Sequence, residues 1–321
     1  MPTPNPKPQT TDRIIFMGTP DFAVASLDAL VQAGFNIVGV VTAPDKPAGR
    51  GMKLTESAVK KYAVEKGLPI LQPQKLKNPA FIEQLRACKA DLQIVVAFRM
   101  LPEIVWNMPP SGTINLHGSL LPQYRGAAPI HWAVINGEKE TGVTTFKLKH
   151  EIDTGDILLQ KKFPIGEDET TGEVHDRMKV TGAALLVETV KGLADGSLEE
   201  IGQSSVVSRE SSELKHAPKI FTENCQIDWD ETADKIHNLI RGLSPFPGAL
   251  TTLDRKILKV YRSRKEVRVQ TQDPGQSFTD GKTYLKFSCA DGYIHILDMQ
   301  LEGKKRMLIE DFLRGYRVPS V

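Results

Sequence analysis

The chain has 321 residues, 40% of them hydrophobic and 25% charged, with a formal net charge of +2. This length allows two domains of roughly 100–200 residues each, and so small a net charge does not by itself indicate a nucleic-acid partner. Cys88, Cys225 and Cys289 lie far apart without metal-ligand spacing, and no apolar run approaches the roughly 20 residues of a membrane span. We therefore expect a cytoplasmic protein with no metal, no disulfide framework and no membrane partner.

In the N-terminal two thirds of the chain, short apolar runs alternate with segments whose apolar residues have helical spacing. Residues 1–11 are polar and Pro-rich, which predicts a disordered leader. Short apolar runs then predict buried strands, at residues 13–17, 36–41, 92–97, 113–116 and 142–148. Apolar spacing of helical period predicts helices between them, at residues 21–30, 55–66 and 171–193. This alternation predicts a doubly wound, Rossmann-like parallel α/β sheet over residues 12–204.

The pattern changes after residue 204. Residues 205–213 are polar and Ser-rich, which predicts a linker. A helix is expected at 232–243, followed by short alternating segments that Gly and Asp separate, at residues 256–261, 284–288 and 293–300. Such segments are typical of a small β-barrel, so residues 214–321 are expected to form a second domain of this kind.

The turn after the first predicted strand does not fit a dinucleotide site. It reads Gly18-Thr19-Pro20-Asp21-Phe22, with Pro20 in place of the second glycine of GxGxxG. That glycine is what lets the backbone approach a pyrophosphate closely. A nicotinamide-dependent enzyme is therefore disfavoured, and the segment is interpreted as a strand-to-helix turn.

Two short motifs carry the candidate chemistry. Asn115 and His117 stand at the predicted end of the 113–116 strand, and Asp153 lies in an Ile-Asp-Thr-Gly-Asp loop after a later strand. Ligands of parallel sheets bind beyond the carboxyl ends of the strands. An amide can donate a hydrogen bond to a developing oxyanion, an imidazole can move protons, and a carboxylate can orient the imidazole. This set suits acyl transfer to an amine without a covalent enzyme intermediate.

At these motifs the chain resembles the folate-dependent formyltransferases. The resemblance is carried by INLHGSLLPQYRGAAPIHW and EIDTGDIL, by FMGTPDF near the N-terminus and by PDKPAGRG, and it covers nearly the whole chain after residue 11. It is closest to the members that formylate methionine on initiator tRNA. It implies an OB-like barrel for the second domain and 10-formyltetrahydrofolate as co-substrate, without a metal. Catalysis is expected of Asn115, His117 and Asp153, and the folate pocket is expected along Ser119, Leu120, Leu121 and Pro122.

The resemblance also implies a tRNA partner, which local charge supports. Residues 255–321 hold 14 Lys and Arg against 8 Asp and Glu, and residues 42–76 hold 7 against 3. Basic patches of this kind attract phosphate. The tRNA contacts are expected at Lys46, Arg50, Lys53, Lys256, Lys259, Arg262, Arg264, Lys304, Lys305 and Arg306, with Arg50 at the position of the family's key loop arginine. A monomer is expected.

Two departures and three rival functions accompany this interpretation. Phe98-Arg99 stand where the family usually has Tyr-Gly near the pterin, and Met52-Lys53 where many members have Lys-Lys. Relatives with the same Asn, His and Asp formylate small amines such as a glycinamide ribotide or an amino sugar nucleotide, generally without both the basic loop and the barrel. The second rival function is hydrolysis of formyl-folate, and the third is that of a non-catalytic RNA-binding module.

Overall fold

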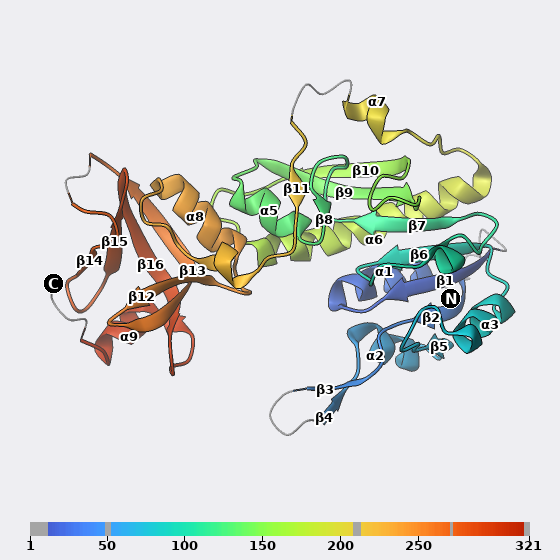
Figure 1. Ribbon diagram of the computed structural model, residues 1–321, viewed down its shortest axis with the longest axis horizontal. Helices are drawn as coiled ribbons and strands as arrows, with labels where there is room; N and C mark the ends of the chain where they lie inside the picture. The colour runs from blue at the N-terminus through green and yellow to red at the C-terminus, as the bar shows by residue number, and fades with distance from the viewer. Residues whose placement is uncertain (1–11, 49–52, 208–212, 270–271, 318–321) are drawn as a thin grey trace, which may run out of the picture. The chain divides into compact units, whose positions relative to one another are not determined.

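The computed structural model describes residues 12–48, 53–207, 213–269 and 272–317 (Figure 1). These residues form two compact units. The first contains the described residues up to Arg125 with Gly142–Lys162 and Asp176–Lys215, and the second contains Gly126–Thr141, Phe163–His175 and the described residues from His216 onward. Two inner segments thus pack with the C-terminal part of the chain, whereas the sequence suggested contiguous domains. The boundaries at 204 and 214 remain a prediction, and the expected leader lies outside the described residues.

Among the described residues, the first unit contains a seven-stranded sheet with the order β10-β9-β7-β6-β1-β2-β5. Its strands are β1 (Arg13–Gly18), β2 (Asn36–Val41), β5 (Ile70–Leu71), β6 (Leu92–Val96), β7 (Thr113–His117), β9 (Glu140–Lys147) and β10 (Ile157–Pro164). The pairs β2–β5, β1–β2, β1–β6 and β6–β7 are parallel, as expected for a doubly wound α/β fold. β9 runs antiparallel to β7. The sheet is therefore mixed at that edge, a common variation of this architecture.

Short elements and helices complete this part of the chain. They are α1 (Asp21–Gln32), β3 (Lys46–Ala48), β4 (Lys53–Thr55), α2 (Ala58–Glu65), α3 (Pro79–Ala87), α4 (Glu103–Trp106), β8 (Arg125–Gly126), α6 (Thr171–Asp195), α7 (Gln203–Val207) and β11 (His216–Ala217). α2 begins three residues later than its apolar spacing predicted, because the Ser57 side chain caps it by accepting from the backbone N–H of Lys60. None of the described helices is long and apolar enough to cross a membrane.

The long helix α6, which agrees with the helix predicted at residues 171–193, begins with a capping box. Oε2 of Glu173 accepts from both the backbone N–H and the hydroxyl of Thr170, at 2.8 Å each. The predicted apolar stripe is buried, at Val174, Met178, Leu185, Leu186 and Val190. The short helix α7, in contrast, occupies the start of the Ser-rich segment for which the sequence predicted only a linker.

The second unit is an antiparallel half-barrel, in agreement with the barrel-like domain predicted from the sequence. Its elements are α5 (Pro129–Ile135), η1 (Thr222–Cys225), α8 (Ala233–Gly242), β12 (Ala249–Leu253), β13 (Lys256–Val267), β14 (Ser277–Thr279), β15 (Leu285–Cys289), β16 (Gly292–Leu301), β17 (Met307–Leu308) and α9 (Ile309–Arg314). Ile236 and Ile240 of α8 pack with Leu258 and Val260 of β13 in its core. These elements give the unit a hydrophobic core of its own.

Candidate active site

Strand β7 carries two polar side chains to the carboxyl edge of the first unit's sheet. Asn115 and His117 are two residues apart, so they point to the same face of the strand. Val95 of β6 pairs with Asn115 on one side, and Thr144 of β9 pairs with His117 on the other. Hydrogen-bonded strands on both sides therefore fix the spacing of the amide and the imidazole.

The Asn115 side chain is half-buried. Its amide makes no hydrogen bond with any residue that the structure describes. An amide carries two N–H donors. In this position they are available to a carbonyl oxygen that becomes negatively charged.

The two ring nitrogens of His117 have different neighbours. The side chain is buried, and Nε2 lies 3.0 Å from the carbonyl oxygen of Tyr124. Because a carbonyl oxygen only accepts hydrogen bonds, Nε2 carries a proton. The nitrogen that can gain or release a proton is therefore Nδ1, which lies 3.9 Å from Oδ2 of Asp153.

Asp153 lies in the turn between β9 and β10 with a φ of 56°, in the left-handed region that Asp tolerates better than most residues. Its side chain is 13% exposed. A separation of 3.9 Å from Nδ1 is too long for a direct hydrogen bond, but the carboxylate charge still acts on the imidazole. The structure thus brings together two of the predicted catalytic residues that are far apart in sequence. The neighbouring Asp156 forms an ion pair with Lys149.

A buried glutamine that the sequence did not single out supports the Asp153 turn. The Gln203 side chain donates to the carbonyl oxygens of Asp153 and Gly155, at 2.9 and 2.8 Å. Its own carbonyl oxygen accepts from Nε and Nη2 of Arg125, at 3.0 and 2.6 Å. We interpret Gln203 as a positioning residue, since it fixes the backbone that carries Asp153.

We expect Gln203→Ala to lower both stability and turnover. The change leaves one buried and one half-buried carbonyl group without this donor, and a buried group without a partner costs about 1–3 kcal/mol. A shifted Asp153 should lower kcat more than it raises KM for either substrate. Thermal unfolding and steady-state rates measure the two effects, with Gln226→Ala, at an exposed glutamine, as the control. Unchanged kcat in Gln203→Ala would leave Gln203 with a structural role alone.

Hydrogen bonds to Thr144 fix the backbone of the segment that is expected to line the folate pocket. Ser119, Leu121 and Pro122 are buried and Leu120 is half-buried. The Thr144 hydroxyl donates to the carbonyl oxygen of Ser119 at 2.7 Å and accepts from the backbone N–H of Leu121 at 3.1 Å. A ligand would therefore meet backbone and the Leu120 side chain more readily than the other side chains. The folate contacts themselves remain a prediction.

Comparison with known proteins agrees with this geometry. Residues 12–190 match the family model "Formyl transferase", and residues 219–317 match "Formyl transferase, C-terminal domain". The chain belongs to the formyl transferase family. Proteins named methionyl-tRNA formyltransferase are similar over 311 residues, with 52% identity in Bacteroides fragilis, 55% in Parabacteroides distasonis and 56% in Phocaeicola vulgatus. Each alignment covers 95% of this chain and 95–96% of the relative.

Several solved structures share the fold at much lower identity. WlaRD, a sugar 3N-formyl transferase, has a TM-score of 0.66 at 19% identity, covering 92% of this chain and 100% of that one. HypX from Aquifex aeolicus, in complex with tetrahydrofolic acid, has a TM-score of 0.64 at 18% identity, covering 95% of this chain and 48% of that one. At such identities the likeness supports the fold alone.

The basic residues expected to contact tRNA in the first unit belong to a hairpin. Strands β3 and β4 pair antiparallel, with Lys46 opposite Thr55. Lys46 is exposed, and Lys53 begins β4. Arg50, the central residue of this prediction, lies outside the described residues. The structure therefore places the two ends of the predicted loop on one hairpin.

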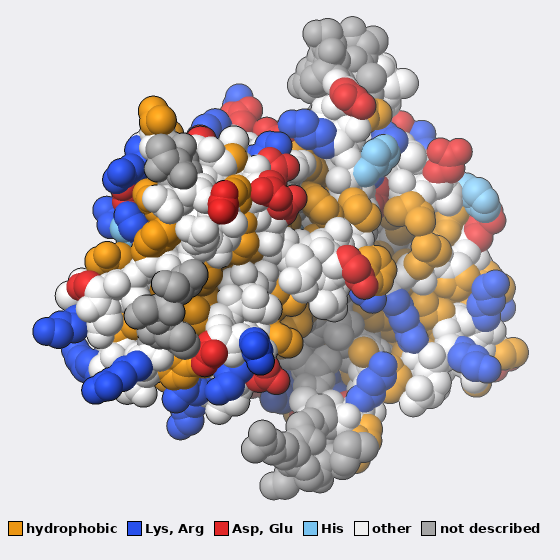
Figure 2. Space-filling view, turned by 60° about the vertical axis from the view of Figure 1, so that its left-hand side comes forward, with side chains coloured by type: hydrophobic (Ala, Val, Ile, Leu, Met, Phe, Trp, Pro, Cys, Tyr) orange, Lys and Arg blue, Asp and Glu red, His pale blue; other side chains and the backbone are white. Residues whose placement is uncertain are grey.

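The half-barrel residues expected to contact tRNA differ in whether they form ion pairs within the protein. Figure 2 shows Lys and Arg side chains interspersed with Asp and Glu on this face of the molecule. Arg262 pairs with Glu173 at 2.5 Å, and Arg306 pairs with Asp298 at 2.5 Å. Four exposed residues form no ion pair with a described residue, namely Lys256, Arg264, Lys304 and Lys305. Charge counts along the sequence could not separate these two groups.

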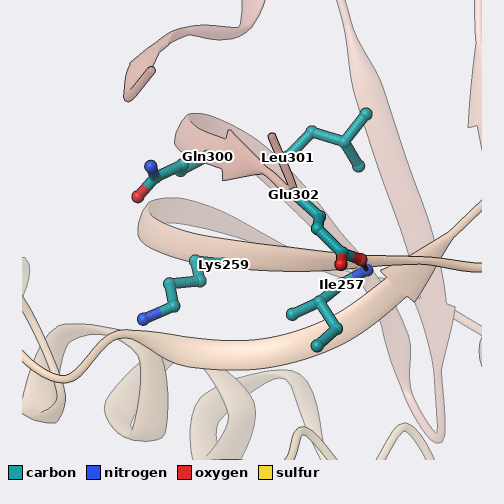
Figure 3. Close-up of a pocket in the computed structure, with 5 residues that line it drawn as sticks. All are labelled: Ile257, Lys259, Gln300, Leu301 and Glu302. Carbon is teal, nitrogen blue, oxygen red and sulfur yellow. Dashed lines mark hydrogen bonds between the residues drawn. The ribbon is translucent and has the colours of Figure 1, made fainter. Parts of the chain in front are cut away.

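Lys259 borders a shallow cavity of about 260 Å³ in the half-barrel (Figure 3). Ile257 and Leu301 form its apolar part, and the backbone N–H of Ile257 donates to Glu302 at 3.2 Å. Nζ of Lys259 itself donates to the carbonyl oxygen of Pro247 at 3.3 Å. Part of its hydrogen-bonding capacity is thus used within the unit.

Phe98 and Arg99, which depart from the family pattern, join two loops of the first unit. The Arg99 guanidinium donates to the carbonyl oxygens of Pro73 and Gln74 and lies 5.6 Å from the centre of the Phe98 ring. Phe98 packs against the apolar cluster between β6 and the helices α3 and α4. The substitution therefore has a structural role that a Tyr-Gly pair could not supply, because glycine has no side chain.

Proposed function

We propose that this chain transfers a formyl group from N10-formyltetrahydrofolate to the α-amino group of methionine on initiator tRNA, for translation initiation. The observation that carries the proposal is the arrangement of Asn115, His117 and Asp153 at the end of β7. Methionyl-tRNA formyltransferases that align over nearly the full chain support the same acceptor. We place the enzyme in the cytoplasm and expect it to act as a monomer.

The residues of the site fit each step of this reaction. The methionine amine attacks the formyl carbon, a C–N bond forms, and the carbonyl electron pair moves to oxygen. The Asn115 amide donates to that oxyanion, and a protonated Nδ1 of His117 adds charge stabilisation. As the intermediate collapses, the bond from carbon to N10 breaks and N10 takes up the proton of His117 Nδ1. Asp153, or the Nδ1 that has given up its proton, receives the surplus proton of the amine, directly or through water.

We assign folate and tRNA to different parts of the molecule. The folate is expected beside the Ser119–Pro122 segment, which hydrogen bonds to Thr144 hold rigid. The tRNA is expected on the hairpin that carries Lys46 and Lys53, at Arg50, and on the basic residues of the half-barrel. Arginine and lysine at such surfaces engage phosphate oxygens, and arginine also stacks on bases.

One assay tests the proposed function. Purified protein is supplied with formyl-folate and with charged initiator tRNA, a glycinamide ribotide, an amino sugar nucleotide or water alone. We expect the methionyl-tRNA to become formylated and the small amines to react poorly. Formylation of a small amine in preference to the tRNA, or release of formate at the same rate without an acceptor, would contradict the proposal.

Arg50 supplies a sharper test of the tRNA contact. It stands between Gly49 and Gly51, so we expect Arg50→Ala to change stability by less than about 0.5 kcal/mol, as is usual for surface substitutions. It should nevertheless cut tRNA formylation strongly. Arg50→Lys should recover only part of the rate, because lysine keeps the charge but loses the planar fork.

A salt series with the three Arg50 proteins separates a specific contact from general attraction. General attraction weakens as salt is added, so it predicts that the differences between variants vanish at high ionic strength. A specific contact predicts that the deficit of Arg50→Lys persists. Equal rates for Arg50→Lys and the parent at every salt concentration would remove Arg50 from the specific contacts.

A further inference from the structure

The half-barrel contains a second cavity that the formyl-transfer chemistry does not use. Its volume is about 200 Å³, and it lies between α8, strands β13 and β16, and the segment that precedes α6. Four basic side chains line it. His237 and Arg241 are buried, and Arg262 and Arg264 are exposed. Asp168 is the acidic residue among the lining side chains. We call it the Arg241 cavity.

Arg241 is a buried cation with unused hydrogen-bonding capacity. The residue is 4% exposed. Its Nε donates to Asn238 at 2.8 Å, and Nη1 donates to the carbonyl oxygens of Gly166 and Glu169 at 3.4 and 3.1 Å. Nη2 donates to no residue that the structure describes. Burial lowers the pKa of this guanidinium, since a desolvated charge is unfavourable without a close counter-ion.

His237 is the second buried basic side chain that lines the Arg241 cavity. The side chain is 3% exposed, and its Nδ1 lies 3.0 Å from the Ser263 hydroxyl. Nε2 is buried and makes no well-aligned hydrogen bond with a described residue. The Asp168 carboxylate lies 3.2 Å from it but is 81% exposed, so it can turn into solvent. A buried polar atom whose described neighbour is an exposed carboxylate, without a well-aligned hydrogen bond, is rare and is consistent with a ligand or water.

A bulge in β13 shapes the mouth of the cavity. The pairing of β13 with β16 shifts register on both sides of Arg262, and Tyr261 and Leu297 have no partner in the ladder of these two described strands. In a regular strand Ser263 would point away from the face that Arg262 and Arg264 share, yet all three line the cavity. Bulges re-aim side chains in this way beside functional sites.

We propose that the Arg241 cavity binds a phosphate group. A guanidinium edge, an imidazole nitrogen and the exposed Arg264, which forms no ion pair within the described chain, provide several donors for one compact anion. Arginine also matches phosphate oxygens in geometry. The phosphate comes either from a nucleic-acid backbone or from a small phosphorylated molecule. The assignment to a tRNA backbone phosphate rests on the proposed function. The phosphate site itself does not, because residues of the second unit alone line the Arg241 cavity.

The binding test uses the full chain and inorganic phosphate. The ring signals of His237 are followed by NMR and assigned by their loss in His237→Gln, with phosphate titrated against chloride at equal pH and ionic strength. We expect a saturable shift with phosphate alone. Arg264→Ala should weaken the apparent affinity about tenfold, as loss of a charged hydrogen bond does. The exposed Lys282→Ala is the charge-matched control and should behave like the parent.

Two results would overturn the proposal. One is a His237 shift that phosphate and chloride produce equally, and the other is an Arg264→Ala titration that matches Lys282→Ala. A second arm identifies the source of the phosphate. If initiator tRNA shifts the His237 signal and blocks the phosphate titration, the Arg241 cavity binds a phosphate of the tRNA backbone. If the titration persists in the presence of bound tRNA, the cavity binds a small phosphorylated molecule. Failure of the parent to formylate tRNA would reject the proposed function and leave the phosphate result unaffected.

Discussion

Asn115→Ala should lower the rate of formyl transfer by about 10²–10³, the usual cost of removing one oxyanion donor. The fold should survive, because the amide has no hydrogen bond with a described residue to lose. Asn115→Asp should be as slow, since a carboxylate keeps the shape but cannot donate. His117→Ala and Asp153→Ala should also be slow. Single-turnover rates with saturating formyl-folate and charged tRNA measure these effects.

Combination variants and a control separate chemistry from folding. The three effects should not multiply, because residues that act as a unit are non-additive. His117→Ala also removes the donor of the Tyr124 carbonyl, so some loss of stability is expected there. Asn107→Ala, at an exposed asparagine, should keep the parental rate. Near-normal turnover of folded Asn115→Ala or His117→Ala would reject the mechanism.

Local sequence patterns predicted most of the sheet, because buried strands give short apolar runs. Such runs identified β1, β2, β6, β7 and β9 but not β5 or β10, and the i, i+2 spacing of Asn115 and His117 places both on one face of β7. Asp153 was found by its motif and not by any local pattern, since no periodicity links it to His117. The distance of 3.9 Å between Nδ1 of His117 and Oδ2 of Asp153 is set by the tertiary structure.

The features that sequence missed depend on long-range partners. Gln203 and Arg125 are 78 residues apart, and Gln203 lies near the end of the predicted 12–204 domain in no predicted helix or strand. Two inner segments, 126–141 and 163–175, pack with the C-terminal unit although the first predicted domain encloses them in sequence. Pairing of surface charge, as between Arg306 and Asp298, is likewise decided by strand register.

Gly155→Ala should nearly abolish turnover through the position of Asp153. A Cβ atom at Gly155 would lie 1.6 Å from the carbonyl oxygen of Lys147, so the backbone of the turn must move. The Gly155 carbonyl also accepts from Gln203, and that bond should break as the turn shifts. We expect a loss of stability of about 1–3 kcal/mol, as for overpacked sites, together with a rate close to that of Asp153→Ala.

Gly39→Ala is the matched control, because its added Cβ would meet Cys88 and Ile15 at 3.5 Å, an ordinary contact. That variant should keep the parental rate and stability. The double variant Gly155→Ala/Asp153→Ala decides how Gly155 acts. If its role is to place Asp153, the double variant should be no slower than Asp153→Ala alone, since both changes remove one interaction. A rate that falls by the product of the single effects would show that Gly155 acts on the site independently of Asp153.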